Sequence, residues 1–370
     1  KPPVGWVLTH HPFGLTRTPM TALPIDPILP DLVAALRAHG RAVLQAPPGA
    51  GKTTRVPLAM LDANLTGGRI IMLEPRRLAT RAAAERLAET LGEPVSQTIG
   101  YRMRGESAVS KATRVEVVTE GILTRMIQSD PELTGIGAVI FDEFHERSLN
   151  ADLGLALAWE IRAALRPDLI LLVMSATLDA GPVATLLDDA PILTSEGRAF
   201  PVTTHHLPKA LPKTTRLEQA TADLIIQAVS ETTGGVLVFL PGEGEIRRVE
   251  SALSGRLPKD CAIRPLYGAL PFAAQRAAIA PVKEGRKIVL STSIAETSLT
   301  IADIRVVIDA GRSRRARVRP AKVRACMCWP PCARPHHAKN CARPRPAEGA
   351  SRCAAKTFTS TAFNKNNPAA

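Results

Sequence analysis

Two short runs of residues in this 370-residue chain have the side chains and the spacing needed to bind and split a nucleoside triphosphate. The first run is Ala46-Pro-Pro-Gly-Ala-Gly-Lys52-Thr53. The second run, Asp142-Glu143-Phe144-His145, follows about ninety positions later. A strand-like apolar stretch leads into each of them, and ligands of open α/β sheets bind where such strands end. The two runs together predict a phosphate-binding loop and the carboxylates that act beside it.

The first run predicts a loop whose backbone N–H groups and following helix N-terminus converge on anionic oxygens. Gly49 and Gly51 let the backbone approach the phosphates, Lys52 reaches the β- and γ-phosphates, and the Thr53 hydroxyl ligates Mg²⁺. The residues expected to hold ATP are Pro48, Gly49, Ala50, Gly51, Lys52, Thr53 and Thr54. The strict pattern has Gly where Ala46 stands, so the competing interpretation is a Gly/Pro-rich turn with an incidental lysine.

The second run places two carboxylates directly after the apolar stretch Ala138–Phe141, at the C-terminal end of an expected buried strand. Asp142 can hold Mg²⁺ while Glu143 polarises the attacking water. The competing interpretation is a helix N-terminus with acids placed for the macrodipole. The expected catalytic residues are Glu143, Asp142, His145 and Lys52.

The elements that must position these residues alternate between helices and short apolar strands. Strands are expected at residues 41–45, 69–73, 114–118, 138–141, 169–174, 236–240, 262–266, 287–291 and 305–308. Helices are expected at residues 31–39, 78–91 and 217–229. This alternation predicts doubly wound parallel sheets in an α/β fold.

The domain organisation follows from where the alternation pauses and stops. We expect a flexible N-terminal segment over residues 1–19 and an ATP-binding domain over residues 20–200. A second α/β domain is expected over residues 201–311, with a linker around residues 195–215. Residues 312–370 form a Cys-, Pro- and Arg-rich tail that is expected to be disordered.

The charge of the chain is distributed unevenly. The net charge is +13, yet residues 1–311 hold 33 Lys and Arg against 33 Asp and Glu. Residues 312–370 hold 14 basic residues, one acid and five of the six cysteines. The overall charge is therefore no argument that the body of the protein binds nucleic acid. No apolar run approaches the roughly 20 residues of a membrane helix, and no N-terminal signal segment is visible, so we expect a cytoplasmic protein.

Further runs along the chain extend the pattern. The Asp-Glu-Phe-His run resembles the DExH signature of superfamily 2 helicases, and other blocks of that superfamily follow in order. They are Leu73-Glu-Pro-Arg-Arg-Leu-Ala79 (motif Ia), Val118-Thr-Glu-Gly-Ile-Leu123 (Ib), Ser175-Ala-Thr177 (III), Val238-Phe-Leu-Pro-Gly242 (IV) and Thr292-Ser-Ile-Ala-Glu-Thr-Ser298 (V). The residues of these motifs are most similar to those of the bacterial HrpB-type DEAH-box ATP-dependent helicases, and the resemblance extends over residues 20 to 311.

The resemblance implies two RecA-like domains that clamp ATP between them and hold nucleic acid across their tops. It implies that His145, Ser175 and Thr177 couple the state of the nucleotide to domain closure. It also implies that four residues hold the sugar-phosphate backbone of a single strand: Arg76, Arg77, Thr119 and Thr292. Contact with the backbone suits a motor that must move over any sequence. Arg76 and Arg77 could instead be the solvated start of a helix, and Thr292 an ordinary turn with a capping residue.

The chain departs from the family pattern after Gly311. The family's motif VI, a Gln-x-x-Gly-Arg-x-Gly-Arg block whose arginines stabilise the transferring phosphoryl group, does not occur. Three interpretations of residues 312–370 compete: a zinc site, an arginine-rich arm that binds RNA, and a shift of reading frame or truncation. The zinc site would use Cys326, Cys328, Cys332, His336, His337 and Cys341. The frame shift is favoured, because alternation, charge balance and family likeness fail together.

The leading functional hypothesis is an ATP-dependent helicase of the DEAH-box type that acts on single-stranded nucleic acid, RNA in preference to DNA, with ATP and Mg²⁺ as cofactors. The alternative is a fragment that binds ATP and nucleic acid with little turnover, since the motif VI arginines are missing.

Overall fold

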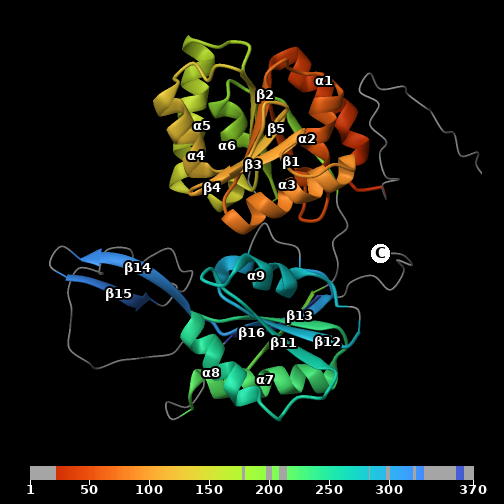
Figure 1. Cartoon of the computed structure of the whole chain (residues 1–370), viewed down its shortest axis with the longest axis vertical. Helices are drawn as coiled ribbons and strands as arrows, with labels where there is room; N and C mark the ends of the chain where they lie inside the picture. Colours follow the sequence, from red (N-terminus) through yellow and green to blue (C-terminus); the bar gives the residue numbers. More distant parts are fainter. Residues whose placement is uncertain are drawn as a thin grey trace, which may run out of the picture. The chain divides into compact units, whose positions relative to one another are not determined.

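The computed structural model describes residues 22–176, 180–196, 202–207, 215–282, 284–296, 301–319, 322–328 and 356–361, with side chains up to residue 314. Two compact units make up the chain, residues 1–198 and 199–370 (Figure 1). We call them the first unit and the second unit. The flexible segment expected over residues 1–19 lies outside the described residues.

The first unit is built on an eight-stranded sheet with the strand order β4-β3-β5-β2-β6-β7-β1-β8. Its strands are β1 (Arg41–Gln45), β2 (Arg69–Glu74), β3 (Ile99–Met103), β4 (Glu106–Ala108), β5 (Val115–Thr119), β6 (Ile136–Phe141), β7 (Ile170–Ser175) and β8 (Ile192–Thr194). Neighbouring strands run parallel, except that the short edge strand β4 is antiparallel to β3. The carboxyl ends of the parallel strands therefore share one edge of the sheet.

Helices cover both faces of this sheet (Figure 1). They are α1 (Leu29–His39), α2 (Lys52–Asp62), α3 (Arg77–Leu91), α4 (Glu120–Ser129), α5 (Leu149–Ala164) and α6 (Ala180–Leu186), with the 3-10 turns η1 (Asp26–Ile28) and η2 (Phe144–Glu146). Strand side chains alternate between the faces: Met72 packs in the core under α1–α3, and Leu73 in the core under α4–α6. Two apolar faces explain why these strands are nearly continuous apolar runs.

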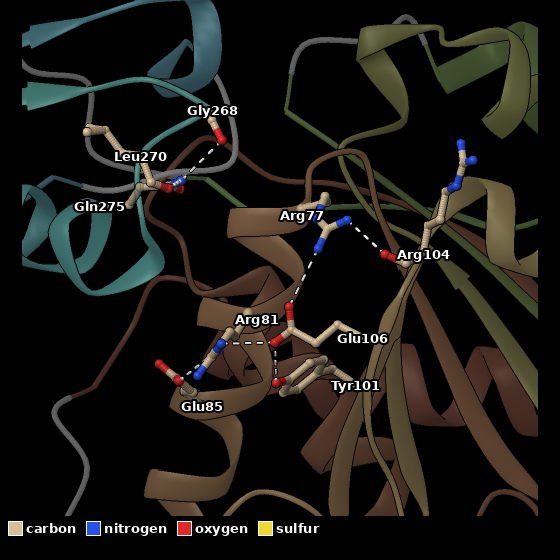
Figure 2. A network of polar contacts seen from close by, with 9 residues as sticks. All are labelled: Arg77, Arg81, Glu85, Tyr101, Arg104, Glu106, Gly268, Leu270 and Gln275. Carbon is tan, nitrogen blue, oxygen red and sulfur yellow. Dashed lines mark hydrogen bonds and ion pairs between the residues drawn. The ribbon is translucent and has the colours of Figure 1, made fainter.

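The second unit contains a six-stranded sheet with the order β11-β12-β10-β13-β16-β9. Its strands are β9 (Val202–His206), β10 (Gly235–Phe239), β11 (Cys261–Leu266), β12 (Arg286–Ser291), β13 (Ile304–Asp309) and β16 (Lys356–Thr361). Its helices are α7 (Leu217–Glu231), α8 (Glu243–Leu253) and α9 (Phe272–Ile279), with the 3-10 turn η3 (Ser293–Ala295). The core lies between α7, α8 and the strands β10, β12 and β13. The turn before α9 is held by Gln275, which donates to the Leu270 carbonyl at 2.7 Å (Figure 2).

The predicted α/β class with parallel sheets is confirmed. Every strand and helix listed in the prediction has an observed counterpart that begins and ends within about two residues of it. The expected linker at residues 195–215 is wrong in part, because β9 lies inside it and pairs with β16 at the edge of the second sheet. Within the tail, the structure describes β16 and the antiparallel pair β14 (Ser313–Arg319) and β15 (Lys322–Cys328).

Candidate functional site

The predicted site residues of the first unit lie in a row along the carboxyl edge of its sheet. The order of the strands fixes the order of the row. In the order of the strands, Thr119 ends β5, Arg76 follows β2 and Asp142 follows β6. Ser175 ends β7, and the loop predicted to bind phosphate (residues 46–51, here called the phosphate loop) follows β1. Residues expected to contact nucleic acid therefore occupy one half of the edge, and residues expected to contact ATP occupy the other half.

The phosphate loop joins β1 to α2, as the sequence predicts. Gly49 and Gly51 have backbone φ angles of 77° and 98°, which side chains with a Cβ rarely adopt. A Cβ on Gly51 would lie 2.6 Å from Leu23 Cδ1, so this position is restricted by space as well as by conformation. Ala46, where the strict pattern has Gly, is buried and its N–H donates to the Ser175 carbonyl at 3.0 Å. The alanine is accommodated because it continues the pairing of β1 with β7 rather than turning.

Lys52 and Thr53 are the first two residues of α2. The Lys52 ammonium is buried, and its Nζ donates to the Ala46 carbonyl at 2.8 Å. The Thr53 hydroxyl donates to Asp142 Oδ2 at 2.6 Å, across 89 positions of sequence. This contact brings the segment that contains Lys52 and Thr53 next to the segment that contains Asp142 and Glu143.

Glu143 stands in a strained and electrostatically unfavourable position. Its φ of 49° is in the left-handed region, which costs a residue with a side chain of order 1 kcal/mol or more. Its N–H donates to Asp142 Oδ1 at 2.8 Å, which fixes the turn. Burial and the neighbouring Asp142 carboxylate raise the pKa of Glu143 to about 7, with Lys52 acting in the opposite direction. A carboxylate with a pKa near neutrality is suited to general base catalysis.

Glu74 is a site residue that the sequence did not single out. It ends β2 within motif Ia and is almost fully buried, and its Oε2 has no hydrogen-bond partner among the described residues. Burial and the charges of Asp142 and Glu143 raise the pKa of Glu74 well above its usual range. The site therefore contains more carboxyl groups than the two that the sequence indicated. The sequence feature that could have indicated Glu74 is a carboxyl residue at the end of an apolar strand.

His145 lies beside the predicted base. Its Nδ1 is 3.2 Å from Glu143 Oε2, without the alignment of a hydrogen bond. Burial lowers the pKa of His145 despite the nearby Glu146 carboxylate, which favours the neutral ring near pH 7. Of the predicted coupling residues, Ser175 is buried at the end of β7, and Thr177 lies outside the described residues.

Two residues in the segment that follows β6, Glu146 and Ser148, contact side chains near those predicted to bind nucleic acid. Arg76 Nη2 lies 3.6 Å from Glu146 Oε2. The Ser148 hydroxyl donates to Glu120 Oε2 at 2.5 Å, directly after Thr119. The sequence missed Ser148, although a serine immediately before an apolar helix is a common N-terminal signal. These two contacts connect the two halves of the sheet edge.

Arg77 and Thr292 complete the predicted set. Arg77 begins α3, and its side chain is 59% exposed. Thr292 precedes η3 in the second unit, and its N–H donates to the Leu266 carbonyl at 3.2 Å. Thr292 is thus held at the carboxyl end of β12, the position that corresponds to the row in the first unit.

Among the described residues, no group of three or more His, Cys, Asp or Glu side chains has the arrangement of a metal site. Most residues of the zinc alternative, from Cys332 onward, lie outside the described part of the chain, so this alternative is not tested. No described helix has the length and the apolar character needed to cross a membrane.

Similarity to known proteins identifies the arrangement. Residues 28–186 match the family model of the DEAD/DEAH box helicase, and residues 218–319 match that of the helicase conserved C-terminal domain. The chain belongs to the DEAD/DEAH-box helicases. It is 52% identical over 302 residues to the ATP-dependent RNA helicase HrpB of Escherichia coli, and 34% identical over 294 residues to the ATP-dependent RNA helicase HrpA of Borreliella burgdorferi. The predicted resemblance to HrpB-type helicases is confirmed.

A crystal structure of the Escherichia coli DEAH/RHA helicase HrpB matches with a TM-score of 0.77 at 50% sequence identity, over 83% of this chain and 39% of that chain. The sequence match to HrpB covers 81% of this chain and 37% of the relative, and the match to HrpA covers 78% and 36%. The chain thus spans well under half the length of the helicases that it matches.

Proposed function

We propose that this chain is the ATP-driven motor part of an RNA helicase of the DEAH-box type. The observation that carries the proposal is the 2.6 Å contact between Thr53 Oγ1 and Asp142 Oδ2, with Lys52 and Glu143 beside it. It supports one site in which a phosphate-binding loop and a pair of carboxylates act together. The names of the relatives, ATP-dependent RNA helicases, support ATP and RNA as the substrates.

In this proposal the loop from Pro48 to Thr54 holds the phosphates of ATP. The Lys52 ammonium exchanges its contacts with the Ala46 and Pro47 carbonyls for the β- and γ-phosphates. Glu143 accepts the proton of the attacking water, and its raised pKa places this group near its titration midpoint at neutral pH. We propose that His145, next to Glu143, and Ser175, at the end of β7, sense the state of the nucleotide.

Mg²⁺ fits the residues that the prediction assigns to it. Thr53 and Asp142 present two hard oxygen atoms in direct contact, and Mg²⁺ is held in NTPases by one or two protein oxygens together with phosphates and water. When bound there, Mg²⁺ would neutralise charge that develops on the phosphates.

Single-stranded RNA is proposed to lie across the other half of the sheet edge of the first unit, on Arg76, Arg77 and Thr119. Thr292, in the second unit, is proposed as a further residue that contacts RNA. These residues are two arginines and two hydroxyl side chains, which suit phosphate and sugar contacts rather than base recognition. The Arg76–Glu146 and Glu120–Ser148 contacts support communication between the RNA residues and the ATP residues of the first unit.

Binding and turnover are tested separately. We expect a fluorescent ATP analogue with Mg²⁺ to bind the whole chain and Glu143→Gln, and to lose all measurable affinity for Lys52→Ala. Lys111→Ala, which removes an exposed lysine after β4, is the matched control and binds like the parent. Phosphate release is then measured with and without single-stranded RNA, and Glu143→Gln should release none. Release by Glu143→Gln at the parent's rate would remove Glu143 from its role.

The same assays separate the second candidate function. Binding of both ATP analogue and RNA without phosphate release by the parent chain would support a binding fragment with little turnover. The observation that favours this candidate is the lack of a Gln-x-x-Gly-Arg-x-Gly-Arg block in the 370 residues. Failure of the parent chain to bind the analogue would refute both candidates.

A further inference from the structure

A carboxylate between two arginines organises the turn that follows β3. Glu106, the first residue of β4, accepts from the Tyr101 hydroxyl at 2.8 Å and from Arg81 Nη1 at 2.9 Å, both on Oε1 (Figure 2). Its second oxygen, Oε2, lies 3.5 Å from Arg77 Nη2. One oxygen therefore fixes the carboxylate to β3 and α3, and the other is left to hold the arginine predicted to contact RNA.

Arg77 is held from two sides. Besides Glu106, its Nη1 donates at 2.8 Å to the carbonyl of Arg104, in the turn between β3 and β4 (Figure 2). A guanidinium carries five N–H donors, so these two contacts leave others available. Because the side chain is 59% exposed, the remaining donors can face a ligand while the group stays anchored.

The remaining partners of Glu106 make its own position rigid. Arg81 Nε also donates to Glu85 Oε1 at 3.2 Å, and the Arg81 guanidinium lies 5.7 Å from the centre of the Tyr101 ring. Tyr101 is buried in β3, which pairs with β5 in the sheet. The chain of contacts thus runs from the core of the sheet, through Tyr101 and Glu106, to the exposed guanidinium of Arg77.

We infer that Glu106 is a positioning residue for RNA binding, which holds the Arg77 guanidinium in place so that little side-chain freedom is lost when it contacts a phosphate. The inference rests on the proposed function of Arg77. Immobilising a long side chain on binding costs free energy, and a group that is already ordered avoids this cost. Arg77 would otherwise be a long, mostly exposed side chain with many accessible rotamers.

The direction in which RNA affinity changes when Glu106 loses its charge distinguishes a positioning role from a purely electrostatic one. Nucleic acid is an anion, so removing a carboxylate close to its path should, by electrostatics alone, strengthen binding. Positioning predicts the opposite result, because loss of the Glu106 charge releases Arg77. Glu85 provides a matched comparison, since its carboxylate also pairs with Arg81 but makes no described contact with Arg77.

The test is the affinity of the whole chain for a fluorescein-labelled single-stranded RNA, measured by anisotropy at fixed salt, for the parent, Glu106→Gln and Glu85→Gln. We expect Glu106→Gln to bind about threefold to tenfold more weakly, the effect of ordering one such side chain. Glu85→Gln should bind as tightly as the parent or slightly more tightly. In a double-mutant cycle, Glu106→Gln should cause no further weakening once Arg77 is replaced by alanine.

Thermal unfolding followed by circular dichroism verifies that each variant is folded, which we expect because partly exposed ion pairs contribute little to stability. Equal or tighter RNA binding by folded Glu106→Gln would overturn the inference, as would the same loss of affinity in the Arg77→Ala background. If the parent chain binds no RNA, the proposed function itself fails, which is a distinct result from failure of Glu106 to position Arg77.

Discussion

The crowding of carboxyl groups at the proposed ATP site leads to a stability prediction that can be tested without any nucleotide. Glu143 is placed where its negative charge is unfavourable, since burial and Asp142 both raise its pKa, to about 7. Replacing Glu143 by Gln keeps the size of the side chain and removes the charge. We therefore expect Glu143→Gln to stabilise the nucleotide-free first unit at high pH.

The magnitude follows from the shift. A carboxyl that titrates near 4.5 in the unfolded chain and near 7 in the folded chain binds its proton more tightly when folded. The stability that the folded chain gains from binding this proton is complete below about pH 4.5 and is lost as the pH rises to about 7. At one pKa unit per 1.4 kcal/mol, ionised Glu143 destabilises the fold by about 3 kcal/mol at pH 8. The glutamine side chain cannot ionise, so the two proteins should differ by this amount at pH 8 and by little at pH 5.

The assay is urea unfolding in buffers without nucleotide or Mg²⁺, monitored by the fluorescence of Trp159 in α5. Trp6 and Trp329 are first replaced by Phe, so that Trp159 alone reports and the transition belongs to the first unit. With a typical dependence of about 2 kcal/mol per molar urea, the midpoint of Glu143→Gln should lie about 1–2 M above the parent's at pH 8.

Glu89→Gln is the control, because Glu89 in α3 has a 75% exposed side chain and its replacement should change stability by less than about 0.5 kcal/mol at either pH. The reasoning would be refuted by a Glu143→Gln variant that is less stable than the parent at pH 8, or by a difference that is the same at pH 5 and pH 8.

Two further predictions concern the backbone around the site. Gly51→Ala should abolish binding of the ATP analogue and lower the free energy of unfolding by about 1 kcal/mol or more, because the added Cβ meets Leu23 and the φ of 98° is unfavourable; Gly121→Ala, with open space around its Cβ, is the comparison for the urea midpoint. Ser148→Ala should cost about 1 kcal/mol of stability by the same measurement, since the hydroxyl caps α5 at Ala151 N; Ser148→Thr should recover most of it, and an unchanged midpoint for the alanine variant would contradict the role of the cap.

Several strands of the fold could be predicted from sequence because both of their faces are apolar. In β7, for example, residues 170–174 are an uninterrupted apolar run because helices cover both sides of the sheet. β3 (Ile99–Met103) could not be recognised in this way, because Gly100 and Arg102 interrupt its apolar pattern. Gly100 is required by a close neighbour: a Cβ there would lie 2.7 Å from the Ala108 carbonyl oxygen on β4.

The parts of the site that could be predicted are those whose residues are neighbours in the sequence. The loop around Lys52 and the pair Asp142–Glu143 each occupy consecutive positions, so their types and spacing are visible in the sequence. The burial of Glu74 is not local, since it depends on strands that the chain supplies later. The contacts of Glu106 with Arg77 and Arg81 are not local either, because both arginines belong to a different element, α3. Glu74 is covered because β5 and β6 pair with β2 on either side.

The Ser148 hydroxyl limits how this position can vary. One oxygen atom accepts from the Ala151 N–H and donates to the Glu120 carboxylate, so it is acceptor and donor at once. Asp is in general as good an N-cap as Ser, but here it would bring a second carboxylate against Glu120 and has no proton to donate at neutral pH. Asn would need its oxygen and its nitrogen to reach the two partners that one atom now serves. Position 148 should therefore tolerate serine and threonine and reject acidic residues that ordinary helix starts accept.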